Sequence, residues 1–124
     1  MLITIELNSP EPIYLQIYAK IVSSIAKGIL KANDSLPSSR KLAKDLGINY
    51  HTVNKAYQLL GMEGFVSLEK KRISISSVSN EGKDEFIPKF EAIGREIINE
   101  GRAKGFDDGS LLIMFQNLLK KEAS

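Results

Sequence analysis

Residues 36–57 constrain the fold most, because they place two short amphipathic helices on either side of a single glycine. Apolar residues recur at helical spacing in the first half of this segment: Leu42, Ala43 and Leu46. Either Ser38 or Ser39 is suited to cap this helix, because a side-chain oxygen there accepts a hydrogen bond from an unpaired backbone N–H. Gly47 is expected to end the helix in a left-handed conformation, with Ile48 folding back as an apolar plug.

The second helix of this segment leaves a polar face uncovered. Asn49 is suited to cap it, and its apolar stripe consists of Val53, Ala56, Tyr57 and Leu60. The residues that therefore point away from the stripe are Tyr50, His51, Asn54, Lys55 and Gln58. Amide and imidazole groups can contact base edges in a DNA major groove, and Lys55 supplies positive charge. The pattern predicts a helix-turn-helix, although a polar outer face is also what any surface helix shows.

A wider pattern over residues 10–77 resembles the winged helix-turn-helix of the GntR family of bacterial transcription regulators. The residues that stand in the order and spacing of that family are Pro12-Ile13-Tyr14, Gln16-Ile17, Ile25, Gly28, Leu30, Leu36-Pro37-Ser38, Arg40, Leu42-Ala43, Leu46-Gly47, Thr52-Val53, Ala56-Tyr57, Leu60 and Glu63-Gly64. The resemblance implies base and phosphate contacts from Arg40 and residues 49–55, and minor-groove or backbone contacts from residues 70–72. The DNA-binding residues it implies are Ser38, Ser39, Arg40, Asn49, Tyr50, His51, Thr52, Asn54, Lys55, Lys70, Lys71 and Arg72.

Two departures from the family pattern stand out. Ala32-Asn33 replace the Pro-Gly that the family usually has after its first helix, and asparagine tolerates the same left-handed conformation, so we expect the turn to survive. The wing tip reads Glu69-Lys70-Lys71-Arg72 and contains no glycine. A two-residue hairpin turn without Gly, Asn or Asp is strained, so the wing is expected to keep its charge but to be short, open or mobile.

The flanking segments complete a mainly helical fold with a small β-hairpin. Leu2–Leu7 is expected to be a short strand or an extended arm. A helix that starts after Pro12 carries a wide apolar face made of Ile13, Tyr14, Ile17, Tyr18, Ile21, Ile25 and Ile29. Residues 65–68 and 73–75 alternate like the two strands of a hairpin, with the basic residues between them.

The C-terminal third reads as a linker and two helices. Residues 78–82 have the small, polar composition of a linker, and residues 83–124 carry two apolar stripes at helical spacing. Pro88 is expected in the first turn of the earlier helix. Asp107 or Asp108 is suited to cap the later one, where a carboxylate also favours the positive end of the helix.

These two apolar stripes are too large to be buried within a hairpin this short, so we expect a second copy of the chain to cover them. The tail resembles that of the YtrA-like subgroup of the family, in which it serves dimerisation. The residues assigned to this homodimer contact are Phe90, Ile93, Ile97, Leu111, Leu112, Phe115, Leu118 and Leu119. Two helices enclose little volume, so a small-molecule effector, as yet unidentified, would have to bind at the dimer interface or the domain junction.

The composition favours a binding protein over an enzyme. The 124 residues include no cysteine and one histidine, His51, so we expect no disulfide, metal site, catalytic cluster or cofactor. Residues 1–80 hold ten Lys or Arg against six acidic residues, a net charge of +4, and residues 81–124 hold seven against nine, a net charge of −2. No apolar run approaches the roughly 18 residues of a membrane span, so a soluble, cytoplasmic protein is expected.

We therefore predict a winged helix-turn-helix DNA-binding domain at residues 1–78 and a two-helix dimerisation segment at residues 79–124. The expected function is that of a sequence-specific transcription regulator, a repressor that binds an inverted-repeat operator as a homodimer. The alternative is a winged-helix module for protein contacts, or an anti-regulator, that binds no DNA. Lysine is depleted at protein interfaces, so Lys55 and residues 70–72 favour DNA over this alternative.

Overall fold

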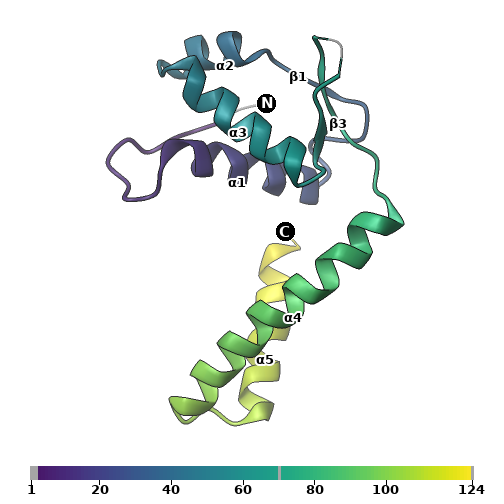
Figure 1. Ribbon diagram of the computed structural model, residues 1–124. Helices are drawn as coiled ribbons and strands as arrows, with labels where there is room; N and C mark the ends of the chain where they lie inside the picture. The colour runs from purple at the N-terminus through teal and green to yellow at the C-terminus, as the bar shows by residue number, and fades with distance from the viewer. Residues whose placement is uncertain (1–2, 70, 124) are drawn as a thin grey trace. The chain divides into compact units, whose positions relative to one another are not determined.

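Residues 3–69 and 71–123 are described by a computed structural model, in which the chain divides into two compact units, Met1–Val78 and Ser79–Ser124 (Figure 1). Over these described residues, the first unit holds three helices and a small sheet, and the second holds two helices. The predicted fold class, mainly helical with a small β-structure, is confirmed. No helix in the described part of the chain is both long enough and apolar enough to cross a membrane.

The core of the first unit forms where helix α1 (Ile13–Ala26) packs against helix α3 (Tyr50–Met62). The side chains without any exposed surface come from both helices: Ile17, Ile21, Val53, Ala56, Tyr57 and Leu60. Helix α2 (Ser39–Leu46) adds Leu42 and Ala43 to this core. Because each set recurs at helical spacing, each helix buries one face and leaves the opposite face to solvent.

The ends of α2 and α3 follow the capping chemistry expected from the sequence. The Ser38 hydroxyl accepts a hydrogen bond from a first-turn N–H at 3.1 Å, so Ser38 rather than Ser39 caps α2. Gly47 ends this helix with a φ of 71°. The Asn49 side chain then accepts a hydrogen bond from the His51 N–H at 2.9 Å and caps α3. These local bonds set where the outer face of α3 begins.

The small sheet has three antiparallel strands in the order β1-β3-β2, with the bounds Ser35–Leu36 (β1), Val66–Ser67 (β2) and Ile73–Ile75 (β3). The predicted hairpin corresponds to β2 and β3, but the sequence prediction missed β1, in which Leu36 pairs with Ile73. A strand of two residues shows no alternation that a sequence pattern could reveal. Asn33 precedes β1 with a φ of 73°, which is the left-handed conformation expected of this turn.

Two predictions at the edges of this unit need correction or narrowing. Ile29, assigned to the apolar face of the first helix, is 65% exposed, because Gly28 turns the chain after the helix with a φ of 75°. Leu30 is buried in its place. Over described residues 3–7 the N-terminal segment forms no strand, which leaves the extended arm of the two alternatives; Leu2 lies outside the described residues.

The second unit consists of α4 (Asn80–Ala103) and α5 (Asp108–Glu122). The predicted linker at residues 78–82 is wrong, because the Ser79 hydroxyl accepts a hydrogen bond from a first-turn N–H at 3.0 Å and caps α4 there. Pro88 lies inside α4 and not in its first turn. This part of α4 is exposed, so water can satisfy the carbonyl that the proline ring leaves without an N–H partner.

Candidate nucleic-acid interface

The outer surface of α2 and α3 brings several of the predicted DNA-binding side chains together. The guanidinium carbon of Arg40 lies 4.2 Å from the centre of the Tyr50 ring, and the ring centres of Tyr50 and His51 lie 4.1 Å apart. Arg40 and His51 are exposed, whereas Tyr50 is half-buried and packs against the core. A ring anchored by the core therefore supports a cation that faces solvent.

Further predicted residues connect the starts of α2 and α3. The Ser39 hydroxyl donates to the side-chain oxygen of Asn54 at 3.4 Å, which joins the two helices. Ser38 and Asn49 use their side-chain oxygens as helix caps, and Thr52 is half-buried in the first turn of α3. Unpaired N–H groups and the positive end of the helix dipole lie at both helix starts, an arrangement that suits phosphate oxygens.

Lys55 has a partner that the sequence did not indicate. Its ammonium nitrogen lies 4.1 Å from the centre of the Tyr14 ring, which belongs to α1. The helical spacing of Tyr14 predicts a core residue. The side chain does pack against the core, but it is only half-buried. The two residues are far apart in the chain and meet only because α1 packs on α3.

Among the described residues of the wing, Lys71 is an exposed cation at the tip and Arg72 is a cation that binds outside the tip. Lys71 is exposed and has a φ of 64°, so the strain expected of a glycine-free tip is located at this residue. The Arg72 side chain donates from Nε to the Ser35 hydroxyl at 2.8 Å and from Nη2 to the Asn33 carbonyl at 2.9 Å. Lys70 lies outside the described residues. The wing is short, as predicted, with strands of two and three residues.

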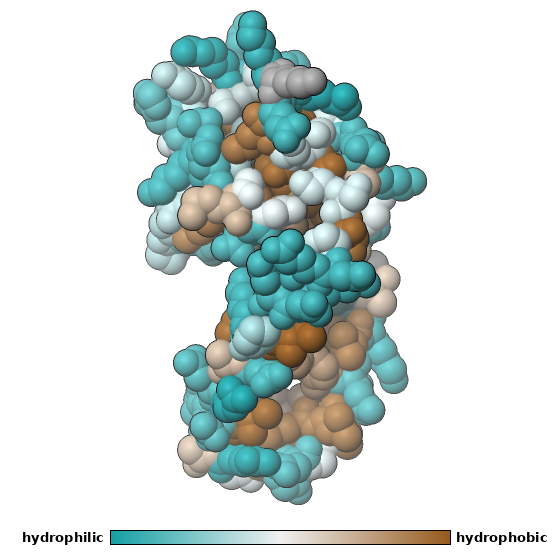
Figure 2. All heavy atoms as spheres, turned by 45° about the vertical axis from the view of Figure 1, so that its right-hand side comes forward, coloured by the Kyte–Doolittle hydropathy of each residue, from teal (hydrophilic) through white to brown (hydrophobic). Residues whose placement is uncertain are grey.

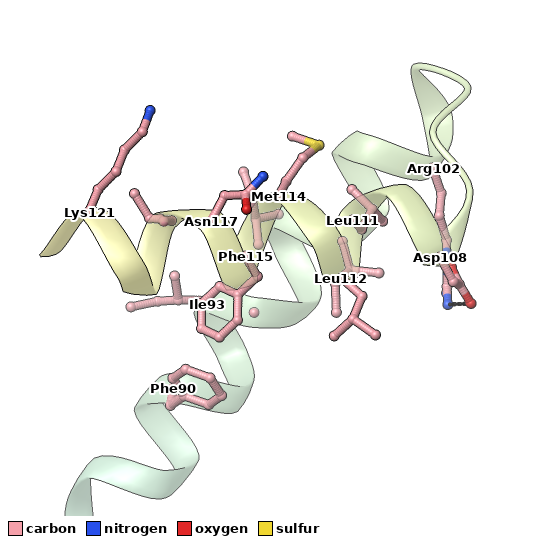
Figure 3. A pocket seen from close by; sticks show the side chains of 14 residues that line it. Phe90, Ile93, Arg102, Asp108, Leu111, Leu112, Met114, Phe115, Asn117 and Lys121 are labelled. Atoms are coloured by element: carbon pink, nitrogen blue, oxygen red, sulfur yellow. Dashed lines mark hydrogen bonds and ion pairs between the residues drawn. The ribbon is translucent and has the colours of Figure 1, made fainter. Parts of the chain in front are cut away.

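Helices α4 and α5 leave a groove of about 890 Å³ between them, and apolar side chains gather on the surface of this unit (Figures 2 and 3). The predicted dimer-contact residues that line the groove are Phe90, Ile93, Ile97, Leu111, Leu112, Phe115 and Leu118. Leu119 is exposed but does not line it, whereas Ile98 and Met114, which the prediction omitted, do. Both omitted residues follow the same helical spacing. Along α4 and α5, which the structure describes throughout, no residue is buried.

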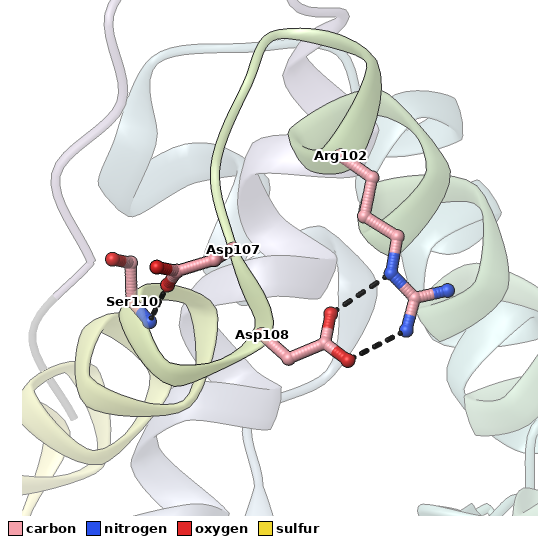
Figure 4. Close-up of polar contacts among 4 residues, drawn as sticks. All are labelled: Arg102, Asp107, Asp108 and Ser110. Atoms are coloured by element: carbon pink, nitrogen blue, oxygen red, sulfur yellow. Dashed lines mark hydrogen bonds and ion pairs between the residues drawn. The ribbon is translucent and has the colours of Figure 1, made fainter.

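A pair of opposite charges and a helix cap hold the turn between α4 and α5 (Figure 4). Arg102 Nε and Nη2 donate to the two carboxylate oxygens of Asp108 at 2.9 and 3.0 Å, and these bonds, with the guanidinium charge, lower the pKa of Asp108. Asp107 accepts a hydrogen bond from the Ser110 N–H at 2.7 Å, which caps α5 and lowers the pKa of Asp107. No cluster of three or more metal-ligating side chains occurs among the described residues.

A helix pair joined by a glycine turn, supported by a third helix and followed by a small β-wing, defines the winged helix-turn-helix class. The chain belongs to the GntR family: the family described as "Bacterial regulatory proteins, gntR family" matches residues 13–73. YtrA from Sulfolobus acidocaldarius, a GntR-family transcription factor of solved structure, is 42% identical, with a TM-score of 0.69 over 83% of this chain and 99% of that one.

Two further proteins show how far the likeness extends. The HTH-type transcriptional repressor YtrA of Bacillus subtilis is 41% identical over 71 residues, which are 57% of this chain and 55% of that protein. A transcriptional antiterminator from Listeria monocytogenes shares the fold, with a TM-score of 0.83 over 100% of this chain and 94% of that one, at 24% identity. The chain spans about half, or less, of the curated relatives it matches. Two of these relatives carry the names of regulatory proteins, a transcriptional repressor and a probable regulator of rhizopine catabolism.

Proposed function

We propose that this protein is a transcription regulator that binds a specific DNA operator as a homodimer and represses transcription, in the cytoplasm. The observation that carries the proposal is Arg40, supported by the Tyr50 ring at 4.2 Å, beside the polar face of α3. A guanidinium that lies over an anchored ring, next to amide and imidazole groups, is suited to reading base edges. The repressor named among the relatives supports the direction of regulation.

In this proposal α3 lies in the major groove and the wing lies beside it. The proposed DNA contacts are Ser38, Ser39, Arg40, Asn49, Tyr50, His51, Thr52, Asn54, Lys55, Lys70 and Lys71. If Arg40 reads a guanine, Arg40→Ala weakens binding at the operator by roughly 1–3 kcal/mol and relaxes the preference at that base pair. An equal loss on all sequences would instead assign Arg40 to a phosphate.

The proposed homodimer covers the groove between α4 and α5. Large apolar side chains there stay about half exposed in a single chain, for example Phe90 at 52% and Phe115 at 47%. A twofold axis lets the same apolar faces cover each other. Two copies of α3 then enter major grooves about one helical turn or more apart, so the operator should be an inverted repeat.

The decisive experiment selects bound duplexes from a random DNA pool with the purified protein. Binding of the enriched duplex is then measured over a salt series. We expect an inverted repeat to be enriched and the affinity to fall steeply with salt, because basic side chains that neutralise phosphates release counterions.

The same experiment addresses the second candidate function, a winged helix that binds a protein partner. No enriched sequence and no duplex binding at low salt would reject the DNA-binding proposal and favour this alternative. The exposed Lys71 argues against it, because lysine is depleted at protein interfaces.

A further inference from the structure

Arg72 precedes β3, and its side chain lies along the outer face of the sheet. Residues alternate between the two faces of this sheet: Leu36 and Ile75 are buried in the core, while Ser35 and Ser74, which pair with each other, face away from it. Arg72 has the same parity as Ser74 and therefore lies on the outer face. This position directs the guanidinium toward β1 and not toward the wing tip.

Two N–H groups of the guanidinium bind neutral oxygens on β1 and in the turn before it. Nε donates to the Ser35 hydroxyl at 2.8 Å, and Nη2 donates to the Asn33 carbonyl at 2.9 Å. The Asn33 N–H also donates to the Ile75 carbonyl at 2.9 Å. A side chain and the backbone thus hold the same corner, where the turn before β1 meets the end of β3.

The wing depends on contacts outside itself because it is short and strained. Its strands have two and three residues, and such a hairpin is marginally stable by itself. The Arg72 N–H donates to the Glu69 carbonyl at 3.1 Å and closes the tip. Lys71, within this tip, has a φ of 64°, a conformation that residues with a Cβ rarely adopt. Contacts with β1, a strand outside the hairpin, therefore add stability to the wing that carries Lys71.

We propose that Arg72 is a positioning residue, which holds the wing against β1 so that Lys71 meets the DNA, and that Arg72 is not itself a phosphate contact. This inference rests on the proposed function, since a wing needs a fixed position only if it binds a partner. It replaces the role that the resemblance implied for Arg72, in which all the cations of residues 70–72 touch DNA.

Arg72→Lys separates the two roles. Lysine keeps the positive charge that a phosphate contact needs, but its ammonium group cannot span both acceptors as the planar guanidinium does. We expect Arg72→Lys to weaken operator binding roughly fivefold, because a loosened wing must be ordered when it binds. Lys71 still reaches its phosphate in the complex, so the dependence on salt should be unchanged. Lys71→Asn is the matched variant: it tolerates the left-handed φ and removes the charge, so the slope of log affinity against log salt should fall by about 0.9 for each protomer.

Amide hydrogen exchange in the free protein tests, without DNA, whether Arg72 holds the wing to β1. We expect the N–H groups of Asn33 and Ile75 to exchange faster in Arg72→Lys than in the wild type, while those of α3 stay unchanged. Faster exchange supports the role of Arg72 in holding the wing even if the wild-type protein binds no DNA. In that case only the proposed function fails.

Three results would overturn the proposal. The first is Arg72→Lys with wild-type exchange. The second is faster exchange with wild-type affinity, because the position of the wing would then not matter for binding. The third is a lower salt slope in Arg72→Ala together with full affinity in Arg72→Lys, which would make Arg72 a phosphate contact.

Discussion

Among single residues, Tyr50 is expected to act on DNA binding through Arg40. Tyr50→Leu removes the ring over which the guanidinium lies at 4.2 Å, whereas Tyr50→Phe keeps it. A cation–π contact at an exposed site contributes about 0.5–1 kcal/mol, so Tyr50→Leu should weaken operator binding roughly two- to fivefold and Tyr50→Phe should bind nearly as the wild type does. Fluorescence anisotropy of a labelled operator measures both affinities.

A double-mutant cycle shows whether Tyr50 acts through Arg40. In an Arg40→Ala background, Tyr50→Leu should cost less than it does in the wild type, because the guanidinium that the ring supports is already absent. The loss that remains belongs to the contacts of the ring itself, such as the one with His51. A loss in Tyr50→Phe as large as that in Tyr50→Leu would contradict the stacking role and point to a DNA contact by the hydroxyl.

Tyr57 makes the stability of the first unit sensitive to alkaline pH. Its ring is fully buried, its hydroxyl donates to the Pro37 carbonyl at 2.8 Å, and burial raises its pKa above the ordinary value of 10.0. Because only the unfolded chain ionises at its ordinary pKa, the stabilisation is complete below about pH 10 and is lost as the pH rises further. Tyr57→Phe should cost about 0.5–1.5 kcal/mol at neutral pH.

Urea unfolding of the wild type and Tyr57→Phe at a series of pH values checks this prediction. The free energy of unfolding should fall less steeply in Tyr57→Phe above about pH 10, since that variant has one titrating group fewer. Parallel curves would mean that Tyr57 ionises equally in the folded and unfolded states.

At the scale of elements, the sequence was informative where the determining contacts are local. Ser38, Gly47 and Asn49 each act within a few residues of their own position, so both ends of α2 and the start of α3 were predictable. β1 was not predictable, because it has two residues and pairs with a strand distant in the chain. The start of α4 was missed because Ser79 caps a first turn whose small, polar composition is also that of a linker.

The candidate interface also has one part that was predictable from the sequence and one part that was not. The polar face of α3 was predictable from its helical period. The contacts of Arg40 with Tyr50, of Lys55 with Tyr14 and of Arg72 with Asn33 join different elements, so they require tertiary packing that no local pattern encodes. These contacts decide which cations have a fixed position.

The turn between α4 and α5 should loosen in acid. The pKa values of Asp107 and Asp108 are lowered by their bonds to Ser110 and Arg102, so the carboxylates stabilise the turn above their ordinary pKa of 3.8, and this stabilisation is lost as the pH falls through the lowered values. Asp108→Asn should remove the part of this dependence that comes from the bond to Arg102, while the Asp107 cap on Ser110 remains. Amide exchange at Ser110 between about pH 2 and 6 measures it.

Asp84→Asn, a loss of an exposed charge elsewhere on α4, serves as the control for Asp108→Asn. The control should exchange as the wild type does. The contribution of Arg102 and Asp108 should also shrink at high salt, because both groups are exposed and mobile ions screen their attraction. Insensitivity of Ser110 exchange to both Asp108→Asn and salt would mean that the pair of Arg102 and Asp108 does not stabilise the turn and that the Asp107 cap is sufficient.

At the scale of the whole molecule, the apolar groove predicts the oligomeric state. Phe115→Glu places a charge in the groove, and twofold symmetry applies the change twice. Because each copy loses roughly the transfer free energy of a buried aromatic ring, the dissociation constant of the dimer should rise at least tenfold. Met62→Glu is the matched control, since Met62 is an 82% exposed apolar residue of the first unit. Sedimentation velocity over a concentration series distinguishes monomer from dimer.

Dimeric Phe115→Glu protein with wild-type affinity between subunits would contradict the assignment of this groove. A monomeric wild-type protein that still binds DNA would contradict the homodimer itself. Only the second result would remove the reason to expect a symmetric operator.

Because no residue along α4 and α5 is buried in the single chain, repression should depend on the concentration of this protein in the cell. If a second copy completes the fold of these helices, their order depends on mass action. While single chains are in excess, doubling the supply of chain raises the paired form about fourfold. Operator occupancy then rises with gene dosage more steeply than in one-to-one binding. When cell growth dilutes the protein, occupancy also falls sooner than it would for a regulator that binds as a single chain.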